Sequence, residues 1–527
     1  MLTRYLAVFL VALSALAGLL GVPGCKPREE ELTTSGGLEF SSDTVKFDTV
    51  FTTLRTVTKR LWVYNRQSRA VNIDLISLEN PAGTGASYTL VINGMPQQTA
   101  ANVLLRGQDS LLVLVRAKLP DNGQNTAPKN FVVEDRLNFS TNGQQQHVLL
   151  RSFGQNIYLH DGTGRNVVLP CNTTWTNDRP HVLYDTVEVP ANCTLRLKPG
   201  TRVFAHPGAV LLVKGTLLVN APADFTPGTG ATDTISAKNA RVVRFAGDRS
   251  GESLYATAPG QWNGLVFYPG SRGNLIRYAV IQNAAQAVLV LNLGSNPAAP
   301  PSPAVDVTLQ NTTIRYISGG NASFAGAASN LLGLPGAAVL SISGQVTAEN
   351  CLFYDCYEYA VLGYGGGTYD FNFCTVANYP ATGAVRKLAS VAFTDVPLDT
   401  TRRYPLSLRL RNSIVWGSID DELYLQHYDA YRAPTTIENC LLKTKYYGTT
   451  TAAPNRPLLA APALRNLVNQ DPQFQKPFGG TFGDYRLKTT SPAYKRANPA
   501  GTALTRDLLN YPRTPGTPSL GAYESGQ

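Results

Sequence analysis

A short phrase recurs between residues 307 and 442, and it constrains the fold more than any other feature of the chain. Each copy alternates apolar and polar residues, reaches a corner residue, and continues with a small residue and further apolar residues. Such alternation is typical of a half-buried strand. Repeats of this kind bury their apolar side only by stacking on copies of themselves. The five copies span residues 307–314, 346–353, 370–376, 408–415 and 436–442.

The corner residue of each copy marks a sharp bend. Four copies have Asn there, which tolerates the left-handed backbone conformation of such a bend better than most residues. Asn amides on stacked coils also form hydrogen-bonded ladders. The third copy departs from the pattern, because Phe373 takes the corner. The sequence predicts a structural ladder of Asn311, Asn350, Asn412 and Asn439.

A small residue follows every corner. Successive small residues are 39, 23, 39 and 27 positions apart. A coil of about 23 residues with variable insertions explains this irregular period. The alternative, a set of unrelated hairpins, does not explain why corner and small residue recur together. The small column consists of Thr312, Cys351, Cys374, Ser413 and Cys440.

The pattern extends upstream into phrases with a family likeness. Residues 275–281 repeat it with Tyr278 at the corner, and 195–203, 209–219 and 261–267 carry Pro-Gly, Gly-Thr-Leu and Trp-Asn-Gly. These phrases resemble the right-handed parallel β-helix proteins of bacterial envelopes, which have a pectate-lyase-like fold. The resemblance covers roughly residues 185–524. It implies a right-handed, single-stranded parallel β-helix. It leaves the activity open, because this superfamily spans lyases, hydrolases, adhesins and inert scaffolds.

The end of the chain carries a second signature. It runs from Asp471-Pro-Gln-Phe through Asp484-Tyr-Arg-Leu to Asp507, Arg513 and a final Gly-Ala-Tyr-Glu524. This resembles the closing segment of secreted β-helix proteins. The resemblance implies a cap over the last coil, whose unpaired backbone edge would otherwise invite aggregation. Leu509 and Asn510 stand where that signature often has Gly, so a different local turn is expected.

The N-terminus reads as a secretory signal with a lipidated cysteine. Arg4 precedes an almost wholly apolar stretch at 5–20, which is short for a membrane span. Val22-Pro-Gly-Cys25 resembles a bacterial lipobox, which implies cleavage before Cys25 and a lipid anchor on it. The alternative is an ordinary signal peptide with a coincidental Cys. The acidic run at 29–31 resembles the surface-export signal of Bacteroidetes lipoproteins. These likenesses imply an outer-membrane lipoprotein facing the cell exterior.

Residues 38–160 follow another pattern. About seven short strands, some separated by Asn-Gly turns, predict an immunoglobulin-like β-sandwich. A stalk or spacer is the expected role of such a domain. The predicted fold class is therefore all-β, with a β-sandwich followed by a β-helix and a C-terminal cap. The predicted segments are a signal peptide at 1–24, an acidic tether at 25–37, a sandwich at 38–160, a β-helix at 161–470 and a cap at 471–527.

Charge and cysteine content exclude several classes of partner. The net charge of +10 is diffuse, and no stretch interleaves clustered Lys and Arg with aromatics, so nucleic acid is not an expected partner. Cys171 and Cys193 flank the start of the β-helix and could close a loop by a disulfide. Cysteines of the small column are expected to be buried free thiols. Cys351 and Cys356 match no zinc spacing, and no metal site is predicted.

Catalytic residues are weakly indicated. A polysaccharide lyase needs carboxylates that hold a divalent cation and a basic residue, and a glycoside hydrolase needs two carboxylates. The candidate acids are Asp355, Asp370 and Asp420, although solvated corner residues are the simpler interpretation. The chain lacks the local motifs of polygalacturonases and pectate lyases. No cofactor is expected, and Ca²⁺ only if the protein is a lyase.

Two functional hypotheses remain. The favoured one is a non-catalytic envelope lipoprotein that binds glycans, adheres or is structural; the alternative is a lyase or hydrolase acting in the β-helix groove. Loops at 294–303, 379–405 and 443–469 are expected to build one wall of that groove. An acid cluster with Lys or Arg in an open groove favours an enzyme, whereas scattered acids favour binding. The aromatic residues considered for stacking on sugars, or for ordinary packing, are Trp262, Tyr268, Tyr357, Tyr359, Tyr364 and Trp416.

Overall fold

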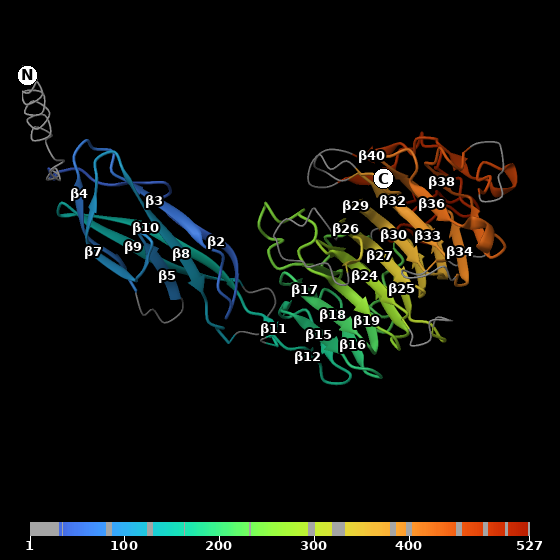
Figure 1. Ribbon diagram of the computed structural model, residues 1–527, viewed down its shortest axis with the longest axis horizontal. Helices are drawn as coiled ribbons and strands as arrows, with labels where there is room; N and C mark the ends of the chain where they lie inside the picture. The colour runs from blue at the N-terminus through green and yellow to red at the C-terminus, as the bar shows by residue number, and fades with distance from the viewer. Residues whose placement is uncertain are drawn as a thin grey trace, which may run out of the picture. The chain divides into compact units, whose positions relative to one another are not determined.

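The computed structural model describes most of the chain after residue 30 (Figure 1). The described residues are 31–33, 35–80, 87–123, 130–162, 164–230, 233–293, 301–318, 333–379, 386–396, 403–448, 456–477, 483–500 and 504–524. They divide into two compact units, one within 1–122 and 130–155, the other within 123–129 and 156–527. The signal peptide and Cys25 lie outside the described residues. Among those described, no helix has the length and apolarity to cross a bilayer.

The first unit is a sandwich of two five-stranded sheets, in the orders β1-β3-β8-β5-β6 and β2-β10-β9-β4-β7. All pairs are antiparallel except β2 with β10. Alternate residues of β8 are buried, as expected of a strand with one face on a core. The strands are β1 (Glu39–Phe40), β2 (Thr44–Phe51), β3 (Lys59–Tyr64), β4 (Val71–Leu78), β5 (Ser87–Ile92), β6 (Met95–Pro96), β7 (Thr99–Leu105), β8 (Ser110–Lys118), β9 (Asn130–Thr141) and β10 (Gln144–Gln155).

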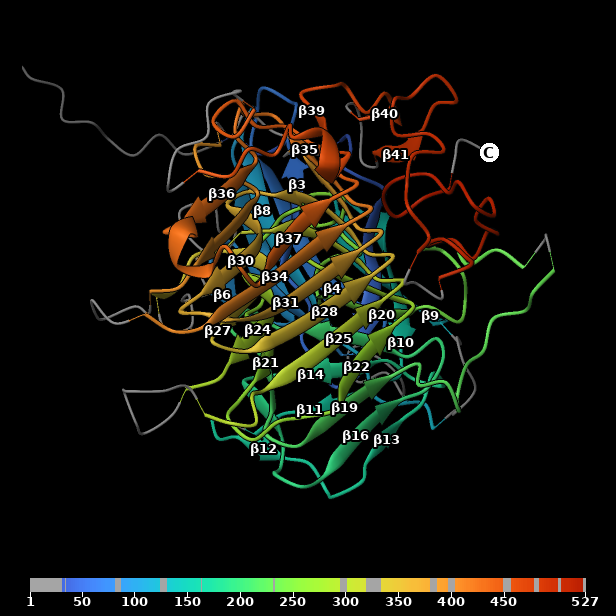
Figure 2. The ribbon, with the colours of Figure 1, turned by 90° about the vertical axis from the view of Figure 1, so that its right-hand side faces the viewer.

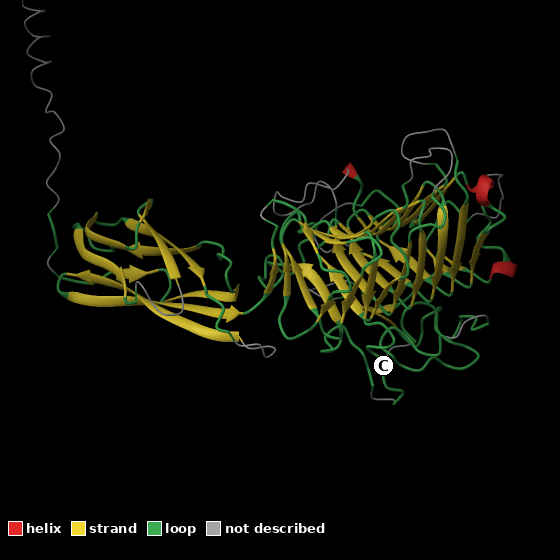
Figure 3. Ribbon diagram, turned by 90° about the horizontal axis from the view of Figure 1, so that it is seen from below, coloured by secondary structure: helices red, strands yellow, loops and turns green. Residues whose placement is uncertain are grey.

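The second unit is a parallel β-helix of three sheets, in which each strand pairs with its counterpart one coil away (Figures 1 and 3). The long sheet contains β11 (Tyr158–His160), β14 (His181–Leu183), β17 (Arg202–Ala205), β20 (Val243–Gly247), β23 (Ala279–Gln282), β26 (Thr313–Ile317), β29 (Leu352–Cys356), β32 (Thr375–Asn378), β35 (Ile414–Gly417), β38 (Leu441–Leu442) and β39 (Leu467–Val468). The second sheet contains β12 (Val167–Val168), β15 (Thr186–Val189), β18 (Val210–Val213), β21 (Gly264–Phe267), β24 (Gln286–Leu291), β27 (Ala337–Ile342), β30 (Tyr359–Tyr364), β33 (Val391–Thr394) and β36 (Leu423–Gln426).

The third sheet of the β-helix, here called the polar sheet, faces the viewer in Figure 2. It contains β13 (Thr174–Trp175), β16 (Thr194–Leu197), β19 (Thr216–Val219), β22 (Asn274–Arg277), β25 (Asp306–Gln310), β28 (Gln345–Glu349), β31 (Gly367–Asn372), β34 (Leu406–Arg411) and β37 (Thr435–Glu438). The remaining elements are two short 3₁₀ helices, η2 (Tyr428–Tyr431) and η3 (Pro462–Leu464), and the hairpin of β40 (Phe474–Lys476) and β41 (Asp484–Leu487). The predicted all-β fold class, a sandwich followed by a parallel β-helix, is confirmed.

Stacking in register builds the apolar interior of the β-helix. One inward column of the polar sheet pairs Leu309 with Ala348, Ala348 with Phe371, Phe371 with Leu410 and Leu410 with Ile437. All five belong to one buried apolar cluster that runs the length of the β-helix. Each coil therefore depends on its neighbours to keep this surface from water. A disulfide joins Cys171 to Cys193 near the first coils, which confirms the predicted loop closure.

The chain turns from the polar sheet into the long sheet at a residue with left-handed backbone conformation. The predicted ladder residues Asn311, Asn350, Asn412 and Asn439 have φ of +49°, +52°, +50° and +50°. Asn220 occupies the equivalent corner with φ of +49°. Tyr278 and Phe373 also adopt positive φ, at +43° and +53°. A bulky residue is costly in this conformation, so packing must hold it there.

In the five copies between residues 307 and 442, the small residue after the corner closes the turn with a hydrogen bond. Its hydroxyl or thiol donates to the carbonyl two residues earlier, immediately before the corner. The distances are 3.0 Å from Thr312, 3.3 Å from Cys351, 3.6 Å from Cys374, 2.6 Å from Ser413 and 3.1 Å from Cys440. In these five copies the position thus combines small size with a donor, which Ser, Thr and Cys share, whereas Ala221 and Ala279 follow the two earlier corners and provide small size alone. The described cysteines of the column are buried free thiols, as expected.

The closing segment, residues 471–524 where described, runs along the flank of the β-helix and reaches further than a cap of the last coil requires. It covers the outer side of the long sheet with an apolar cluster that includes Tyr354, Phe373, Tyr485 and Leu520. The corner amides bond to it: Asn311 Nδ2 to Asp507 O (2.8 Å), Asn350 Nδ2 to Arg506 O (2.9 Å), and Asn412 Nδ2 to Asn498 O (3.0 Å). The side-chain amides of Asn311, Asn350 and Asn412 thus donate hydrogen bonds to the closing segment.

The signature residues of the closing segment form its internal lock. Buried Arg513 lies 4.0 Å above the Phe373 ring, donates to Asn350 Oδ1 (2.7 Å) and faces Glu524 at 3.6 Å. Asp507 Oδ2 accepts the backbone N–H of Glu524 at 2.9 Å. This arrangement explains why the third copy tolerates Phe at its corner, since the aromatic ring is the surface on which Arg513 rests. Asn510 adopts φ of +69°, the conformation for which Gly is otherwise favoured.

Ser413 offers a direct test of the corner hydrogen bond. Replacing Ser413→Ala removes the donor to Arg411 O, which is partly buried, and the acceptor of the Cys374 N–H, which is buried. We expect the free energy of unfolding to fall by about 1–3 kcal/mol, the cost of unsatisfied buried polar groups. Chemical denaturation of the full chain measures this change. Ser413→Cys keeps a small donor, as in three other coils, and should lose less than half as much; equal losses would contradict the role given to the hydroxyl.

Candidate functional site

The three candidate acids lie on different sides of the β-helix. Asp355 is in β29 of the long sheet, Asp370 is in β31 of the polar sheet, and Asp420 is in the turn between β35 and β36. Because they lie on different sides, these three acids do not form the pair of carboxylates that glycoside hydrolysis requires. Each acid has its own surroundings, and each has a structural explanation.

Asp355 is buried on the flank that the closing segment covers. It is 6% exposed and has φ of +50°. Burial raises the pKa of Asp355 to about 7, an effect that the charge of Arg315 opposes. Its Oδ1 atom has no hydrogen-bond partner. Because its pKa is raised by burial, this carboxyl is neutral below about pH 7, and its low exposure leaves little of it in contact with solvent.

Asp370 is neutralised by two arginines of the neighbouring coil. Arg411 Nη2 donates to both carboxylate oxygens, at 3.0 and 3.2 Å, and Arg409 Nη1 lies 3.4 Å from Oδ2. The three residues come from β31 and β34, in which Asp370 pairs directly with Arg409 and Asn372 with Arg411. The cross-strand charge pairing stabilises the stack of coils and leaves the Asp370 carboxylate occupied.

The Asp420–Glu422 run serves the turn in which it lies. Glu422 is fully buried and accepts two hydrogen bonds of 2.9 Å from the equally buried Arg386. Asp421 Oδ1 accepts bonds from Thr444 Oγ1 (3.0 Å) and the Tyr446 N–H (2.7 Å). Asp420 is exposed. The buried bidentate ion pair of Glu422 with Arg386 fixes the geometry of the turn. Loss of either residue would leave the other as an uncompensated buried charge.

The outer surface of the polar sheet carries polar side chains in rows that run across its strands, which Figure 2 shows from that side. We call two of these outward rows over the later coils the polar face. One row stacks Thr308, Thr347, Asp370, Arg409 and Thr436. The other stacks Asp306, Gln345, Thr368 and Ser407. All nine are partly or fully exposed. Successive side chains of a row are about 4.8 Å apart, the spacing of neighbouring strands.

A pocket opens where the chain passes from β33 of the second sheet to β34 of the polar sheet. We call it the corner pocket; its volume is about 370 Å³. Asp395, only 2% exposed, lies in its wall and is held at Oδ1 by His427 Nδ1 (3.1 Å). Arg403 Nη1 lies 3.6 Å from Asp395 Oδ2. The corner pocket is lined by Asp395, Arg403, Tyr404, Pro405, Leu406, Ala430, Tyr431 and Pro434.

No sequence motif indicates this pocket. Asp395 falls within the predicted loop at 379–405, but Asp395 and His427 are 32 residues apart and match no motif. They meet because β33 and β36 pair in register, which brings Thr394 opposite Gln426 and the two following residues together. A strand register of this kind becomes predictable only once every coil boundary is known.

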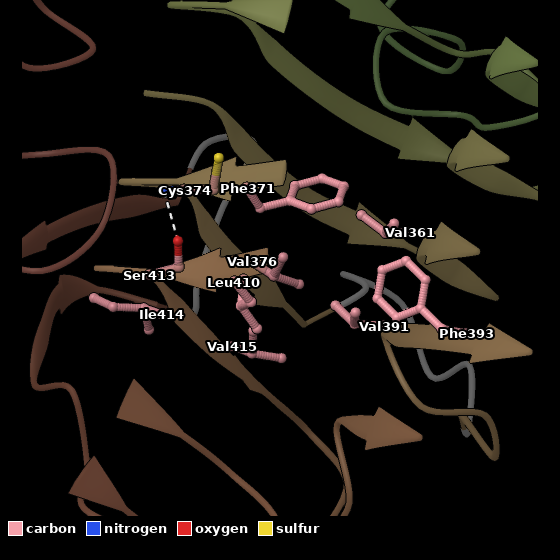
Figure 4. Close-up of a pocket in the computed structure, with 10 residues that line it drawn as sticks. All are labelled: Val361, Phe371, Cys374, Val376, Val391, Phe393, Leu410, Ser413, Ile414 and Val415. Carbon is pink, nitrogen blue, oxygen red and sulfur yellow. Dashed lines mark hydrogen bonds between the residues drawn. The ribbon is translucent and has the colours of Figure 1, made fainter. Parts of the chain in front are cut away.

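A second cavity lies inside the β-helix and is too small for a ligand. Its volume is about 10 Å³, at the lower limit for a single water. Figure 4 shows its lining, which is apolar apart from Ser413 and Cys374, joined by the Cys374 N–H to Ser413 Oγ bond of 3.0 Å. It is a packing gap lined by residues of β30, β31, β32, β33, β34 and β35.

Most of the aromatic residues considered for sugar stacking serve in packing. Trp262 is fully buried and donates its indole N–H to Gln282 O at 2.9 Å. Tyr357, Tyr359, Tyr364 and Trp416 are half-buried, and Tyr268 is 43% exposed. Among the residues that the structure describes, no group of three or more His, Cys, Asp or Glu side chains is placed to hold a metal ion.

Asp355 provides a test of a structural against a catalytic carboxyl. Its folded-state pKa of about 7 lies above the ordinary value of 3.8, so the folded state binds the proton more tightly than the unfolded state. This favourable contribution is complete below about pH 3.8 and is lost as the pH rises through 7. Asp355→Asn, which keeps the shape and tolerates positive φ, should therefore raise the free energy of unfolding by on the order of 3 kcal/mol at pH 8 and by little at pH 4.

The measurement is chemical denaturation at both pH values. Asp420→Asn, a matched change at an exposed acid, should leave stability nearly unchanged at each pH. Equal stability of wild type and Asp355→Asn at pH 8 would show that the ionised, buried carboxylate does not destabilise the fold.

Comparisons with known proteins show distant structural similarity only. No protein-family model matches the chain, and no curated protein matches its sequence. Among solved structures it is similar to the catalytic domain of a GH87 α-1,3-glucanase in complex with nigerose, at 8% identity over 74% of this chain and 82% of that one, with a TM-score of 0.22. It is also similar to a family 123 glycoside hydrolase from Clostridium perfringens, at 9% identity and a TM-score of 0.16, over 23% of this chain and 27% of that one. Likeness at this level carries no information on activity, and the fold is shown by the parallel sheets themselves.

Proposed function

We propose that this protein is an outer-membrane lipoprotein, anchored through a lipid on Cys25 and facing the cell exterior, whose β-helix binds glycans without cleaving them. The sandwich serves as a spacer. The observation that carries the non-catalytic part is the placement of the acids. Asp370, which lies on the polar face, is held by two arginines, whereas Asp355 is buried on another flank.

The polar face supports binding of an extended polar polymer. Its rows offer hydroxyl, amide, carboxylate and guanidinium groups at the strand repeat, on a surface made rigid by the stacked coils beneath. Exposed Arg409 forms an ion pair with Asp370 at 3.4 Å and still has 54% of its side chain accessible. A glycan chain presents many hydroxyls along its length, so weak hydrogen bonds to successive coils add up through multiple contacts.

The proposed anchor is supported by the sequence of the N-terminus. The apolar stretch at 5–20 and the Val22-Pro-Gly-Cys25 string match the requirements for export and acylation, and two or more acyl chains on one Cys give a stable membrane attachment. The acidic run at 29–31 supports an exterior orientation.

Glycan binding by the polar face is tested with Arg409→Ala. We expect the full-length protein to be retarded in affinity gels that contain at least one of a panel of plant, algal and host polysaccharides. The variant should bind that polysaccharide roughly tenfold more weakly, because it loses a charged donor worth about 1.4 kcal/mol. Product release, measured as reducing ends and as unsaturated ends with and without Ca²⁺, should be absent.

Arg60→Ala in the sandwich is the matched control, since it removes the same charge from an exposed strand position. Retardation that drops equally in both variants would indicate non-specific attraction of a basic protein. Release of reducing or unsaturated ends would overturn the non-catalytic proposal in favour of a hydrolase or lyase, and a panel with no retardation would overturn glycan binding.

The anchor is tested with Cys25→Ala. Loss of the acylated thiol should move the protein from the membrane fraction to the soluble fraction of the expressing cells, because the apolar anchor is never attached. Metabolic labelling with a radioactive fatty acid should mark the wild type and not the variant. Labelling of both proteins would place the lipid elsewhere.

A further inference from the structure

We propose that the corner pocket is a second carbohydrate site, which holds one uncharged pyranose ring by hydrogen bonds that its hydroxyls donate to Asp395 and accept from Arg403. This inference rests on the proposed glycan binding and deepens it, because it assigns a ligand class to a built pocket apart from the polar face. Its volume of about 370 Å³ falls in the range of pockets that take small molecules.

The strongest indication of a ligand is an unpartnered carboxylate oxygen. Asp395 is 2% exposed, and its Oδ2 atom has no hydrogen-bond partner among the described groups. A carboxylate only accepts hydrogen bonds, and leaving a buried acceptor unpaired costs about 1–3 kcal/mol. The other oxygen already accepts from His427, and the Asp395 carbonyl accepts the Tyr404 N–H at 2.8 Å. The chain therefore fixes Asp395 in place and leaves Oδ2, which faces Arg403 at 3.6 Å, without a hydrogen bond beside the pocket.

The charges around the pocket favour an uncharged donor. Arg403 lies 3.6 Å from the free oxygen, and His427 is on the opposite oxygen, so the negative charge of Asp395 is already balanced without a bound cation. Nearly half of the Arg403 side chain is exposed, which leaves donor capacity for ligand oxygens. An O–H group satisfies both sides, because it donates to Asp395 Oδ2 and accepts from Arg403.

The remaining walls suit the C–H surface of a sugar. Buried Tyr431 and partly exposed Tyr404 contribute aromatic rings, and Pro405, Leu406 and Pro434 contribute apolar surface. A pyranose combines a rim of hydroxyls with C–H faces, and aromatic rings commonly pack against such faces while the rim is hydrogen-bonded. Leu406 begins β34, which also carries Ser407 and Arg409, so the pocket lies at the edge of the polar face.

The test uses small sugars that the pocket alone would hold. Full-length protein in a sugar-free detergent is titrated with the methyl glycosides of glucose, galactose and mannose, and with methyl galacturonide as the anionic comparison, by ligand-observed NMR. At least one neutral glycoside should bind with a Kd in the millimolar range. Asp395→Asn and Arg403→Ala should each weaken it at least tenfold, while Arg432→Ala, a neighbouring exposed arginine outside the lining, should not.

Arg403→Ala guards against misfolding, since nearly half of the side chain is exposed and the residue belongs to no apolar core cluster. Binding of no neutral glycoside, equal binding by wild type and both pocket variants, or binding of the galacturonide alone would each overturn the pocket assignment. Retardation by a polysaccharide that is unchanged in both pocket variants would leave the polar face as the binding surface. Glycoside binding without polysaccharide retardation would instead retain the pocket and remove the polar face.

Discussion

The left-handed corner between the polar sheet and the long sheet is the constraint on which the β-helix depends. Each coil must bend from one sheet into the next within two residues there, and in the five repeat copies the small donor after the corner secures the turn by bonding the carbonyl just before it. If the corner opened, the next strand would leave register with the coil below, and its whole inward face would shift toward solvent. The apolar interior, the disulfide and the surface rows all presuppose that this bend has the same geometry in every coil.

The two corners with aromatic residues show what happens when the local rule is broken. Tyr278 packs edge-on against Phe225 with ring centroids 5.1 Å apart, and Phe373 supports Arg513. In both places a segment outside the regular coils supplies the packing that holds a bulky residue at positive φ. The outer segments and the repeat are therefore mutually dependent, and the closing segment belongs to the same structural unit as the coils that it covers.

How much of this could be predicted from sequence depends on whether a feature is local. The strand period, the Asn corners and the small column are properties of a few adjacent residues, so the fold class and the corner residues followed from the repeat. The donor role of the small column was not predicted, although its restriction to Ser, Thr and Cys carried that information. The candidate acids were chosen by position relative to the strands, which does not reveal that Asp355 lies under the closing segment or that Asp370 faces Arg411. Asp395 and His427 were missed because their contact is created by the insertion lengths of two coils.

The hydrogen bonds of the closing segment change how this solenoid should come apart. An unstrapped stack of repeats frays from its ends, with each coil lost at the cost of one interface. Here Asn510 Nδ2 bonds Gly228 O at 2.9 Å, Asn350 receives Arg513, and Asn412 exchanges bonds with Asn498, so one segment ties early, middle and late coils together. Coils that would otherwise melt one by one are thereby joined into a single cooperative block. Proteolytic cleavage that released the closing segment would again allow the coils to unfold one at a time from the ends of the β-helix, even with every coil sequence intact.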